Sequence, residues 1–507
     1  MTALKKIKTA LVSVFYKDGL VDVMERLQQL GIEVYSTGGT LNFIKENGFD
    51  VKSIESLTGY PSILGGRVKT LHPKVFGGIL ARRENKDDLN QLEEYEIPSF
   101  DLVVVDLYPF EETLSSTDDT GEIIEKIDIG GITLIRAAAK NFKDVLVVPG
   151  SSMYGELINL LESKKGETDL EDRRYFAAQA FNISSHYDTA IFNWINPGNI
   201  RAFKQSILDA TVLRYGENPH QEGVFFGKPD EVYEQLHGKA ISYNNLLDLD
   251  AAINLISDFQ ETTFAVIKHN NACGLASRKT LKQAWTDALA GDPVSAFGGV
   301  LAANRTIDRE TAEEINKIFF EIIIAPSYED DALEILKTKK NRIILILKSF
   351  KFPDYQFRSV LNGALYQEKD TVTETAEHLK TVTRITPSPE QVEDLLFANK
   401  IVKHTKSNTI VLANHKQLIG SGTGQTSRVD ALKQAIEKAR NFNLPLEGAV
   451  MASDAFFPFA DSVEIAYKAG IKAVIQPGGS IRDQDSIDYC NEHDIPMVFT
   501  GIRHFKH

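Results

Sequence analysis

Cysteine is scarce in this chain, with only Cys273 and Cys490 among 507 residues. Two cysteines so far apart supply neither a disulfide framework nor a thiolate cage for zinc, and they fit a reducing cytoplasm. Basic residues are also in deficit, because 56 Lys and Arg stand against 70 Asp and Glu, a net charge of −14. This balance argues against broad binding to nucleic acid or to an anionic membrane.

Long apolar runs are missing as well. The longest, such as residues 343–347, are far too short to span a bilayer, and no apolar stretch typical of a signal peptide follows the lysines of residues 1–10. An apolar fraction of 43% and a charged fraction of 25% are ordinary for a globular protein. At 507 residues, about three domains are expected.

The first 200 residues alternate between strand and helix patterns, which predicts a parallel sheet. Strands are expected at residues 10–15, 33–35, 101–107 and 145–148, and a long helix at residues 170–194. That helix meets Asn-Pro-Gly-Asn at residues 196–199, the clearest domain boundary of the chain.

A glycine turn follows the second of these strands. Its residues are Ser36, Thr37, Gly38, Gly39 and Thr40, and a helical pattern begins directly after them. Strand, glycine turn and helix start in this order can cradle a phosphate. A tight connection without a ligand is the alternative, because the P-loop lysine is absent.

Two further polar blocks lie in the same part. Residues 65–73 place Arg67, Lys69 and Thr70 beside a Gly-Gly pair that lets backbone approach a ligand, the alternative being a basic surface loop. Asp128 precedes a helix of small residues and Lys140 lies near its end. Taken alone, these two could be only a helix cap and a favourable terminal charge.

The second part of the chain carries its own polar blocks. Residues 213–221 gather a cation, a phenol, an imidazole and amides on a backbone fixed by Gly and Pro, which is typical of a binding loop. A strand at residues 263–267 delivers Lys268 and His269 at its carboxyl end, where open α/β sheets bind ligands. Residues 454–461 form an aromatic stretch between carboxylates that suits either a flat ligand or the core.

A zinc deaminase is a competing interpretation of the loop at 213–221. His220-Gln221-Glu222 matches half of the zinc signature, but no Pro-Cys-x-x-Cys follows. No catalytic metal is therefore predicted.

Together these blocks resemble, in order and along nearly the whole chain, the bifunctional purine-biosynthesis family with AICAR transformylase and IMP cyclohydrolase activities. The resemblance implies an α/β fold: a methylglyoxal-synthase-like parallel-sheet domain over residues 1–197, then two cytidine-deaminase-like domains over residues 200–375 and 376–507. Alternatively, the C-terminal segment forms part of the domain at residues 200–375. No repeat between them is visible in the sequence.

The resemblance also implies the chemistry. The formyl group of 10-formyltetrahydrofolate passes to AICAR, and formyl-AICAR then closes to IMP with loss of water. For transfer, His269 is the candidate base and Lys268 stabilises the developing oxyanion. The resemblance implies that Arg214 and Tyr215 hold the nucleotide and that Asn408 and Arg503 contact it or order the site. It places Phe456 and Asp461 in the folate region.

For ring closure the resemblance points to Lys69, Thr70, Tyr108, Asp128 and Lys140. It places Ser36 to Thr40 and Arg67 around the phosphate. It also implies a homodimer whose transformylase site is shared between subunits.

Two positions depart from the family pattern. Ala272 stands where proline is usual after Lys-His, and residues 15–19 read Phe-Tyr-Lys-Asp-Gly in place of Ser-Asp-Lys-Thr-Gly. Two competing functions therefore stay open: a cyclohydrolase whose transformylase half is inactive, and a non-catalytic module that binds AICAR.

Overall fold

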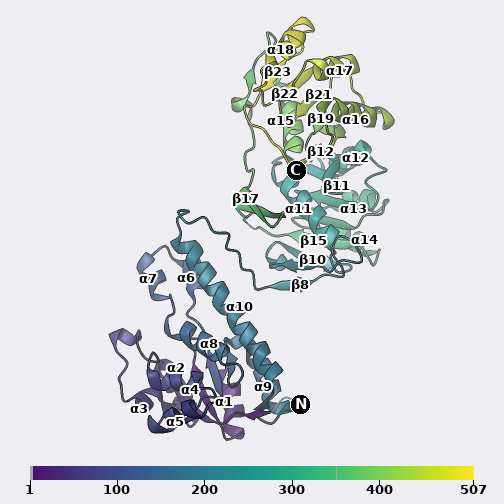
Figure 1. Ribbon diagram of the computed structural model, residues 1–507. Coiled ribbons are helices and arrows are strands. Elements are labelled where there is room, and N and C mark those ends of the chain that lie inside the picture. The colour runs from purple at the N-terminus through teal and green to yellow at the C-terminus, as the bar shows by residue number, and fades with distance from the viewer. Residues whose placement is uncertain (1–3, 350) are drawn as a thin grey trace. The chain divides into compact units, whose positions relative to one another are not determined.

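The computed structural model describes residues 4–349 and 351–507, which form two compact units (Figure 1). Unit 1 ends at Leu208 and unit 2 runs from Asp209 to His507. The boundary follows the long helix α10 (Leu170–Ile195), which ends at the predicted Asn-Pro-Gly-Asn break. Residues 197–208 between that break and unit 2 form no helix or strand.

Unit 1 is built on a five-stranded sheet with the order β4-β3-β2-β5-β6. Every neighbouring pair in it is parallel, which confirms the predicted parallel α/β fold. The strands are β2 (Thr9–Ser13), β3 (Glu33–Ser36), β4 (Lys52–Ser53), β5 (Leu102–Val105) and β6 (Leu146–Val148), with β1 (Lys5–Lys6) and β7 (Glu167–Thr168) as a separate antiparallel pair.

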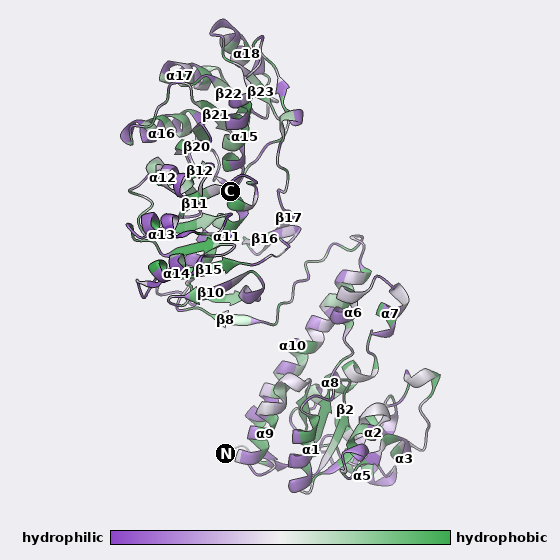
Figure 2. Cartoon of the chain, turned by 180° about the vertical axis from the view of Figure 1, so that it is seen from behind, coloured by the Kyte–Doolittle hydropathy of each residue, from purple (hydrophilic) through white to green (hydrophobic). Residues whose placement is uncertain are grey.

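Helices cover both faces of this sheet. One face packs on α1 and α9 through residues such as Val12 and Val104, and the other packs on α4, α8 and α10 through Leu11 and Val103. Alternate strand residues thus enter two cores, so β5 and β6 are apolar throughout and β2 is apolar at its centre, as Figure 2 shows by the green colour of this sheet. The helices are α1 (Leu20–Gln29), α2 (Gly38–Glu46), α3 (Ile54–Thr58), α4 (Pro73–Leu80), α5 (Lys86–Glu94), α6 (Phe110–Ser116), α7 (Thr120–Glu125), α8 (Gly130–Lys140), α9 (Tyr154–Ser163) and α10, with 3₁₀ turns at Leu64–Gly66 and Ser151–Met153.

Unit 2 contains one mixed sheet of twelve strands, in the order β10-β15-β14-β13-β11-β12-β20-β19-β21-β22-β23-β18. Its strands are β10 (Tyr233–His237), β11 (Thr263–Lys268), β12 (Asn271–Ser277), β13 (Val300–Ala303), β14 (Ile322–Ala325), β15 (Ile343–Leu347), β18 (Lys380–Thr381), β19 (Ile410–Asn414), β20 (Gln417–Gly422), β21 (Val450–Ser453), β22 (Ala473–Gln476) and β23 (Met497–Phe499). Two small hairpins lie outside it, β8 (Ala210–Val212) with β9 (Val224–Phe226) and β16 (Tyr355–Val360) with β17 (Gly363–Glu368).

The same order of elements occurs twice in unit 2. A helix, an antiparallel hairpin, and three further helices that alternate with three strands run from α11 to β15 and again from α15 to β23. The two halves meet where β12 pairs with β20. The helices are α11 (Tyr243–Ser257), α12 (Leu281–Gly291), α13 (Arg309–Ile315), α14 (Asp330–Lys337), α15 (Pro389–His404), α16 (Arg428–Asn441), α17 (Asp461–Ala469) and α18 (Asp483–Glu492), with 3₁₀ turns at Pro229–Glu231 and Ala376–His378.

The repeat extends to details of the two hairpins. The register shifts between Val266 and Ile267 in the first hairpin and between Leu412 and Ala413 in the second. A Cβ at Gly274 would lie 2.0 Å from a carbonyl oxygen of α12, and one at Gly420 would lie 2.2 Å from a carbonyl oxygen of α16. Each hairpin therefore needs glycine at the same place for its helix to approach.

One continuous sheet thus spans both parts predicted as residues 200–375 and 376–507. Helices α11 and α15 contribute to one core cluster, whereas α12 to α14 and α16 to α18 form two clusters on the opposite face. The division near residue 375 and the cytidine-deaminase-like character of each half stay predictions. The duplicated order of elements is a structural repeat that the sequence did not reveal.

Candidate functional site

A cavity of about 640 Å³ lies in unit 1 at the carboxyl ends of β2, β3 and β5. This is the edge at which open parallel sheets bind ligands. Among the predicted residues, its walls contain Thr37, Gly39, Thr40, Arg67, Lys69, Thr70, Tyr108 and Asp128. The structure therefore brings together side chains from segments that lie as far apart as residues 37 and 128.

The N-terminus of α2 forms one end of this cavity. Thr37 precedes the helix but makes no side-chain cap, since its hydroxyl donates to Glu55 Oε1 at 2.6 Å. Thr40 Oγ1 donates to the Val14 carbonyl at 2.7 Å, so that hydroxyl holds the chain instead of a ligand. Ser36 Oγ is buried and has no hydrogen-bond partner among the residues that the structure describes. Uncapped N–H groups at a helix start favour an anion.

The side chain of Lys69 passes over Gly66, which lines the cavity, and Gly38 beside it. A Cβ at Gly38 would lie 3.2 Å from Lys69 Nζ, and one at Gly66 would lie 2.7 Å from Lys69 Cε. Larger residues at either position would displace this cation from the start of α2. Arg67, in contrast, is exposed and forms an ion pair with Glu125.

Two buried carboxylates face the same space. Burial raises the pKa of Asp128, although its Oδ1 accepts from the Gly131 N–H at 2.6 Å and its Oδ2 from the Tyr108 N–H at 3.3 Å. Burial likewise raises the pKa of Asp106. The pKa of the Tyr108 phenol is raised by burial and by these two carboxylates. A protonated phenol therefore lies beside acids that resist ionisation.

Asp106 and Lys17 line the cavity but were not predicted. Asp106 Oδ2 accepts from the Tyr16 N–H at 3.0 Å and Asp106 also holds the Phe15 N–H, which fixes the segment that departs from the family pattern. Lys17 Nζ donates to the Phe15 carbonyl at 2.8 Å. Asp106 ends a buried strand run, a signal that would have found it.

Lys140 does not reach this cavity with the others. It is the last residue of α8, and Asp128 lies two residues before the first. At 1.5 Å per residue, the eleven-residue helix separates them by roughly 16 Å. Asp128 is also not the N-cap, which is Ile129. Gly38 and Ser36 lie beside the cavity, but their atoms do not line it.

In unit 2, Lys268 and His269 lie at a tight hairpin turn. The predicted strand at residues 263–267 is β11, which leads directly into antiparallel β12. His269 and Asn270 both adopt left-handed φ values, 52° and 65°. The His269 side chain is exposed, and Lys268 Nζ donates to the carbonyls of Phe297 at 2.9 Å and Gly298 at 3.1 Å. Ala272 lies opposite Ile267 beside the bulge.

A second cavity, of about 790 Å³, contains Arg214 and Tyr215. The Arg214 guanidinium lies 5.5 Å from the centre of the Tyr215 ring. The loop is closed by a hydrogen bond of 2.7 Å from the Gly216 N–H to the Gln221 carbonyl. Neither Lys268 nor His269 lines this cavity.

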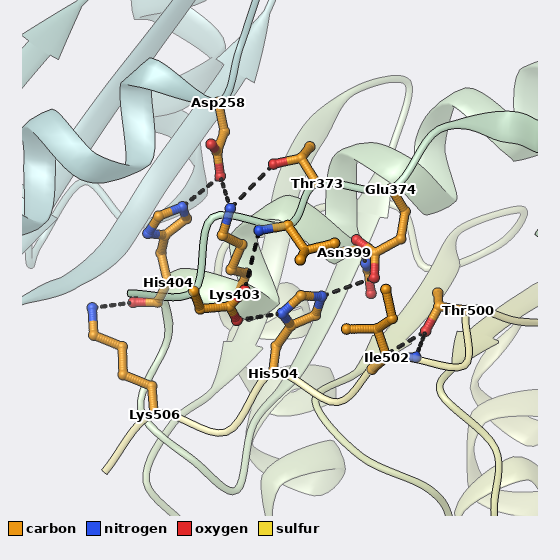
Figure 3. Close-up of polar contacts among 12 residues, drawn as sticks. Asp258, Thr373, Glu374, Asn399, Lys403, His404, Thr500, Ile502, His504 and Lys506 are labelled. Carbon is orange, nitrogen blue, oxygen red and sulfur yellow. Dashed lines mark hydrogen bonds and ion pairs between the residues drawn. The ribbon is translucent and has the colours of Figure 1, made fainter. Parts of the chain in front are cut away.

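The C-terminal segment is joined by a polar network to Glu374 and to His404 at the end of α15 (Figure 3). His504 bridges Asp370 at 2.6 Å and Glu374 at 2.8 Å. Burial alone would lower the pKa of His504, but the two carboxylates outweigh it and raise the pKa to about 9. The Ser407 N–H donates to the Lys506 carbonyl at 2.8 Å, so the C-terminal segment is fixed against the residue before Asn408.

The predicted folate positions are exposed. Phe456 exposes 37% of its surface, and Asp461 is the first residue of α17. Phe457 between them is fully buried, so this stretch serves both the core and the surface. In the described ranges 4–349 and 351–507, no three His, Cys, Asp or Glu residues cluster as a metal site. No helix in those ranges is long and apolar enough to cross a membrane.

Two α/β units, each with polar side chains gathered at strand ends or turns, are typical of an enzyme with two separate sites. The chain matches a family model described as the AICARFT/IMPCHase bienzyme over residues 138–438, and one described as an MGS-like domain over residues 19–133. The "Bifunctional purine biosynthesis protein PurH" of Bacteroides thetaiotaomicron is 62% identical over 507 residues, the whole of both chains.

The protein of the same name from Persephonella marina is 48% identical over 518 aligned positions, which cover 99% of this chain and all of that one. A solved structure titled "Crystal structure of ForH" is 34% identical over 38% of this chain and all of its own, with a TM-score of 0.34. This chain belongs to the AICARFT/IMPCHase bienzyme family. The resemblance read from the sequence blocks is thereby confirmed.

Proposed function

We propose that this chain performs the last two steps of IMP synthesis, with ring closure in unit 1 and formyl transfer in unit 2. Family membership supports the two activities, AICAR formyltransferase and IMP cyclohydrolase. The assignment of ring closure to unit 1 rests on the cavity of that unit. Its walls bring together Lys69, Thr70, Tyr108 and Asp128 within the part that matches an MGS-like domain.

The phosphate of formyl-AICAR binds at the start of α2. The uncapped helix start attracts the anion, Ser36 Oγ has no other partner in the described chain, and Lys69 lies over Gly38. Arg67, at the exposed rim, is available once it leaves Glu125. This end fixes the nucleotide and directs its base toward Tyr108 and Asp128.

Ring closure then joins the carboxamide nitrogen to the formyl carbon. Because the reaction is intramolecular, holding the two groups in place supplies much of the rate. The Asp128 carboxylate accepts the proton from the nitrogen, and the Tyr108 hydroxyl donates to the formyl oxygen. The protonated Asp128 then returns its proton to the hydroxyl of the resulting carbinol, and water leaves as the carbon–oxygen bond breaks. The former formamide nitrogen forms the carbon–nitrogen double bond, and its proton returns to Tyr108. Lys140 is assigned no direct step, because it lies at the far end of α8.

Formyl transfer takes place at the turn of unit 2. The AICAR amine attacks the formyl carbon of 10-formyltetrahydrofolate, the bond to N10 breaks, and His269 carries the proton from the amine to N10. Lys268 stabilises the developing oxyanion from its place beside Gly298. Arg214, Tyr215, Asn408 and Arg503 hold the nucleotide. Phe456 and Asp461 hold the folate.

A homodimer would complete this second site. Within one chain, His269 does not line the cavity that contains Arg214 and Tyr215. A second copy of the chain can therefore supply the nucleotide-binding residues beside His269. The β16–β17 hairpin supports this arrangement, since all twelve of its strand residues are exposed. The two free, buried cysteines support a reducing, cytoplasmic location.

Two single-site variants test whether the two activities belong to separate sites in units 1 and 2. We expect His269→Ala to lose formation of formyl-AICAR by ~10²–10⁴-fold and still to close supplied formyl-AICAR. Lys69→Ala is expected to show the reverse. Wild-type protein that only closes formyl-AICAR would favour the cyclohydrolase alternative. Binding of AICAR without either reaction would favour the non-catalytic module.

A further inference from the structure

The turn that carries His269 has a structural counterpart in the second half of unit 2. Lys268 and Asn271 pair at the end of the first hairpin, and Asn414 and Gln417 pair at the end of the second. His269 therefore occupies the same place as His415. Both hairpins share the bulge and the tightly packed glycine described above, so the equivalence does not depend on the turns themselves.

Both turns adopt a backbone that needs support. The residues after Lys268 have φ values of 52° and 65°, and those after Asn414 have 50° and 53°. None of the four is glycine, and left-handed φ is unfavourable for a residue that carries a Cβ. Such a conformation persists only where neighbouring groups hold it.

A carboxylate at the same position of the preceding helix holds each turn. Asp248 is the sixth residue of α11, and its Oδ1 accepts from the Asn270 N–H at 2.6 Å. Asp394 is the sixth residue of α15, and it accepts from the His415 N–H at 2.8 Å and the Lys416 N–H at 2.6 Å. The same device thus occurs in both halves.

The second turn has further ties. Arg278 donates to the His415 carbonyl at 2.7 Å and to the Lys416 carbonyl at 3.2 Å. In the first turn, the His269 carbonyl accepts from Asn271 Nδ2, within the hairpin, at 2.7 Å. Within residues 4–349 and 351–507, the hydrogen bond from the Asn270 N–H to Asp248 is therefore the one that ties the backbone of the first turn to a helix.

We propose that Asp248 is a positioning residue for formyl transfer, because its bond to the Asn270 N–H fixes the backbone that aims the His269 imidazole. The proposal rests on the proposed role of His269. Asp248 does not exchange a proton with the substrate. Without it, the strained turn relaxes and the imidazole is held less closely to the reacting amine, and a misplacement near 1 Å can cost ~10²-fold in rate.

Three variants test this, each assayed for both activities. Asp248→Ala removes the acceptor, Asp248→Asn keeps an oxygen that can accept the same N–H, and Asp394→Ala removes the matched acceptor from the second turn. We expect Asp248→Ala to lower kcat for formyl transfer ~10–100-fold, with the KM for AICAR changed much less. Asp248→Asn should recover most of the loss. Ring closure in unit 1 should be unaffected throughout.

The pH profile separates positioning from proton transfer. A positioning role lowers the rate of Asp248→Ala by the same factor at every pH, whereas a direct acid or base role changes the shape of the profile. The proposal is overturned if Asp248→Ala retains transfer within twofold, if Asp394→Ala loses as much, or if Asp248→Asn is as impaired as the alanine variant. If Asp248→Ala does not fold, the asparagine variant and its profile decide alone. Retained transfer in His269→Ala would instead refute the proposed function of that residue.

Discussion

Replacing His504 by glutamine removes the cation between two carboxylates. His504 is 2% exposed, and Glu374 is similarly buried. The pKa of His504 is about 9 in the folded chain against 6.5 for a free histidine, a difference that corresponds to about 3 kcal/mol. A histidine whose pKa is higher in the folded chain than in the unfolded chain stabilises the fold while it is protonated. For His504 this stabilisation is complete below the unfolded pKa of 6.5 and is lost as the pH rises through the folded pKa of about 9.

We therefore expect His504→Gln to lower the free energy of unfolding of unit 2 by about 3 kcal/mol at pH 6.5, and to differ little from wild type at pH 10. Urea unfolding followed by the fluorescence of Trp285 reports on unit 2, in a Trp194→Phe background that silences unit 1. His507→Gln, which replaces an exposed histidine, is the matched control. A difference between His504→Gln and wild type that stays constant from pH 6.5 to 10 would refute the linkage.

Three further changes test separate parts of the structure. Gly274→Ala places a Cβ 2.0 Å from a carbonyl oxygen of α12 and should lower the urea midpoint of unit 2 by the equivalent of ~1–3 kcal/mol, whereas Gly363→Ala meets nothing within 4 Å and should be neutral. Asp128→Asn should slow ring closure ~10²–10⁴-fold in a direct assay with formyl-AICAR and leave formyl transfer unchanged; equal loss of both would contradict the division of sites. Asp258→Asn removes the carboxylate charge that pairs with the buried ammonium of Lys403 at 3.0 Å and binds His404 at 2.7 Å, and it should cost ~3–5 kcal/mol in urea unfolding; a variant as stable as wild type would show that the Lys403 pair is solvated.

Local patterns predicted the fold of unit 1 well. The strand expected at residues 10–15 is β2 at Thr9–Ser13, and Gly31 follows α1 with a φ of 68°, as its C′ position requires. These features depend on near neighbours in the sequence. The strand expected at residues 263–267 is β11, but the sequence did not show that a hairpin turn follows it.

Contacts between distant segments could not be predicted from the residues themselves. The repeat in unit 2 lies in strand register and helix packing, which many sequences satisfy, so it was not visible in the sequence. The bridge from His504 to Asp370 joins residues 134 positions apart. Asp248 looks like an ordinary polar residue of α11 until the turn above it is seen.

A mixing experiment tests the central claim, that one chain holds two separate catalytic sites. Lys69→Ala and His269→Ala are incubated with AICAR and 10-formyltetrahydrofolate, first singly and then together, and IMP is measured by chromatography. If the sites are separate, neither variant alone makes IMP at an appreciable rate, and the mixture does, because formyl-AICAR released by Lys69→Ala is closed by His269→Ala. The claim would be contradicted if the mixture made no more IMP than either variant alone and if His269→Ala also failed to close supplied formyl-AICAR.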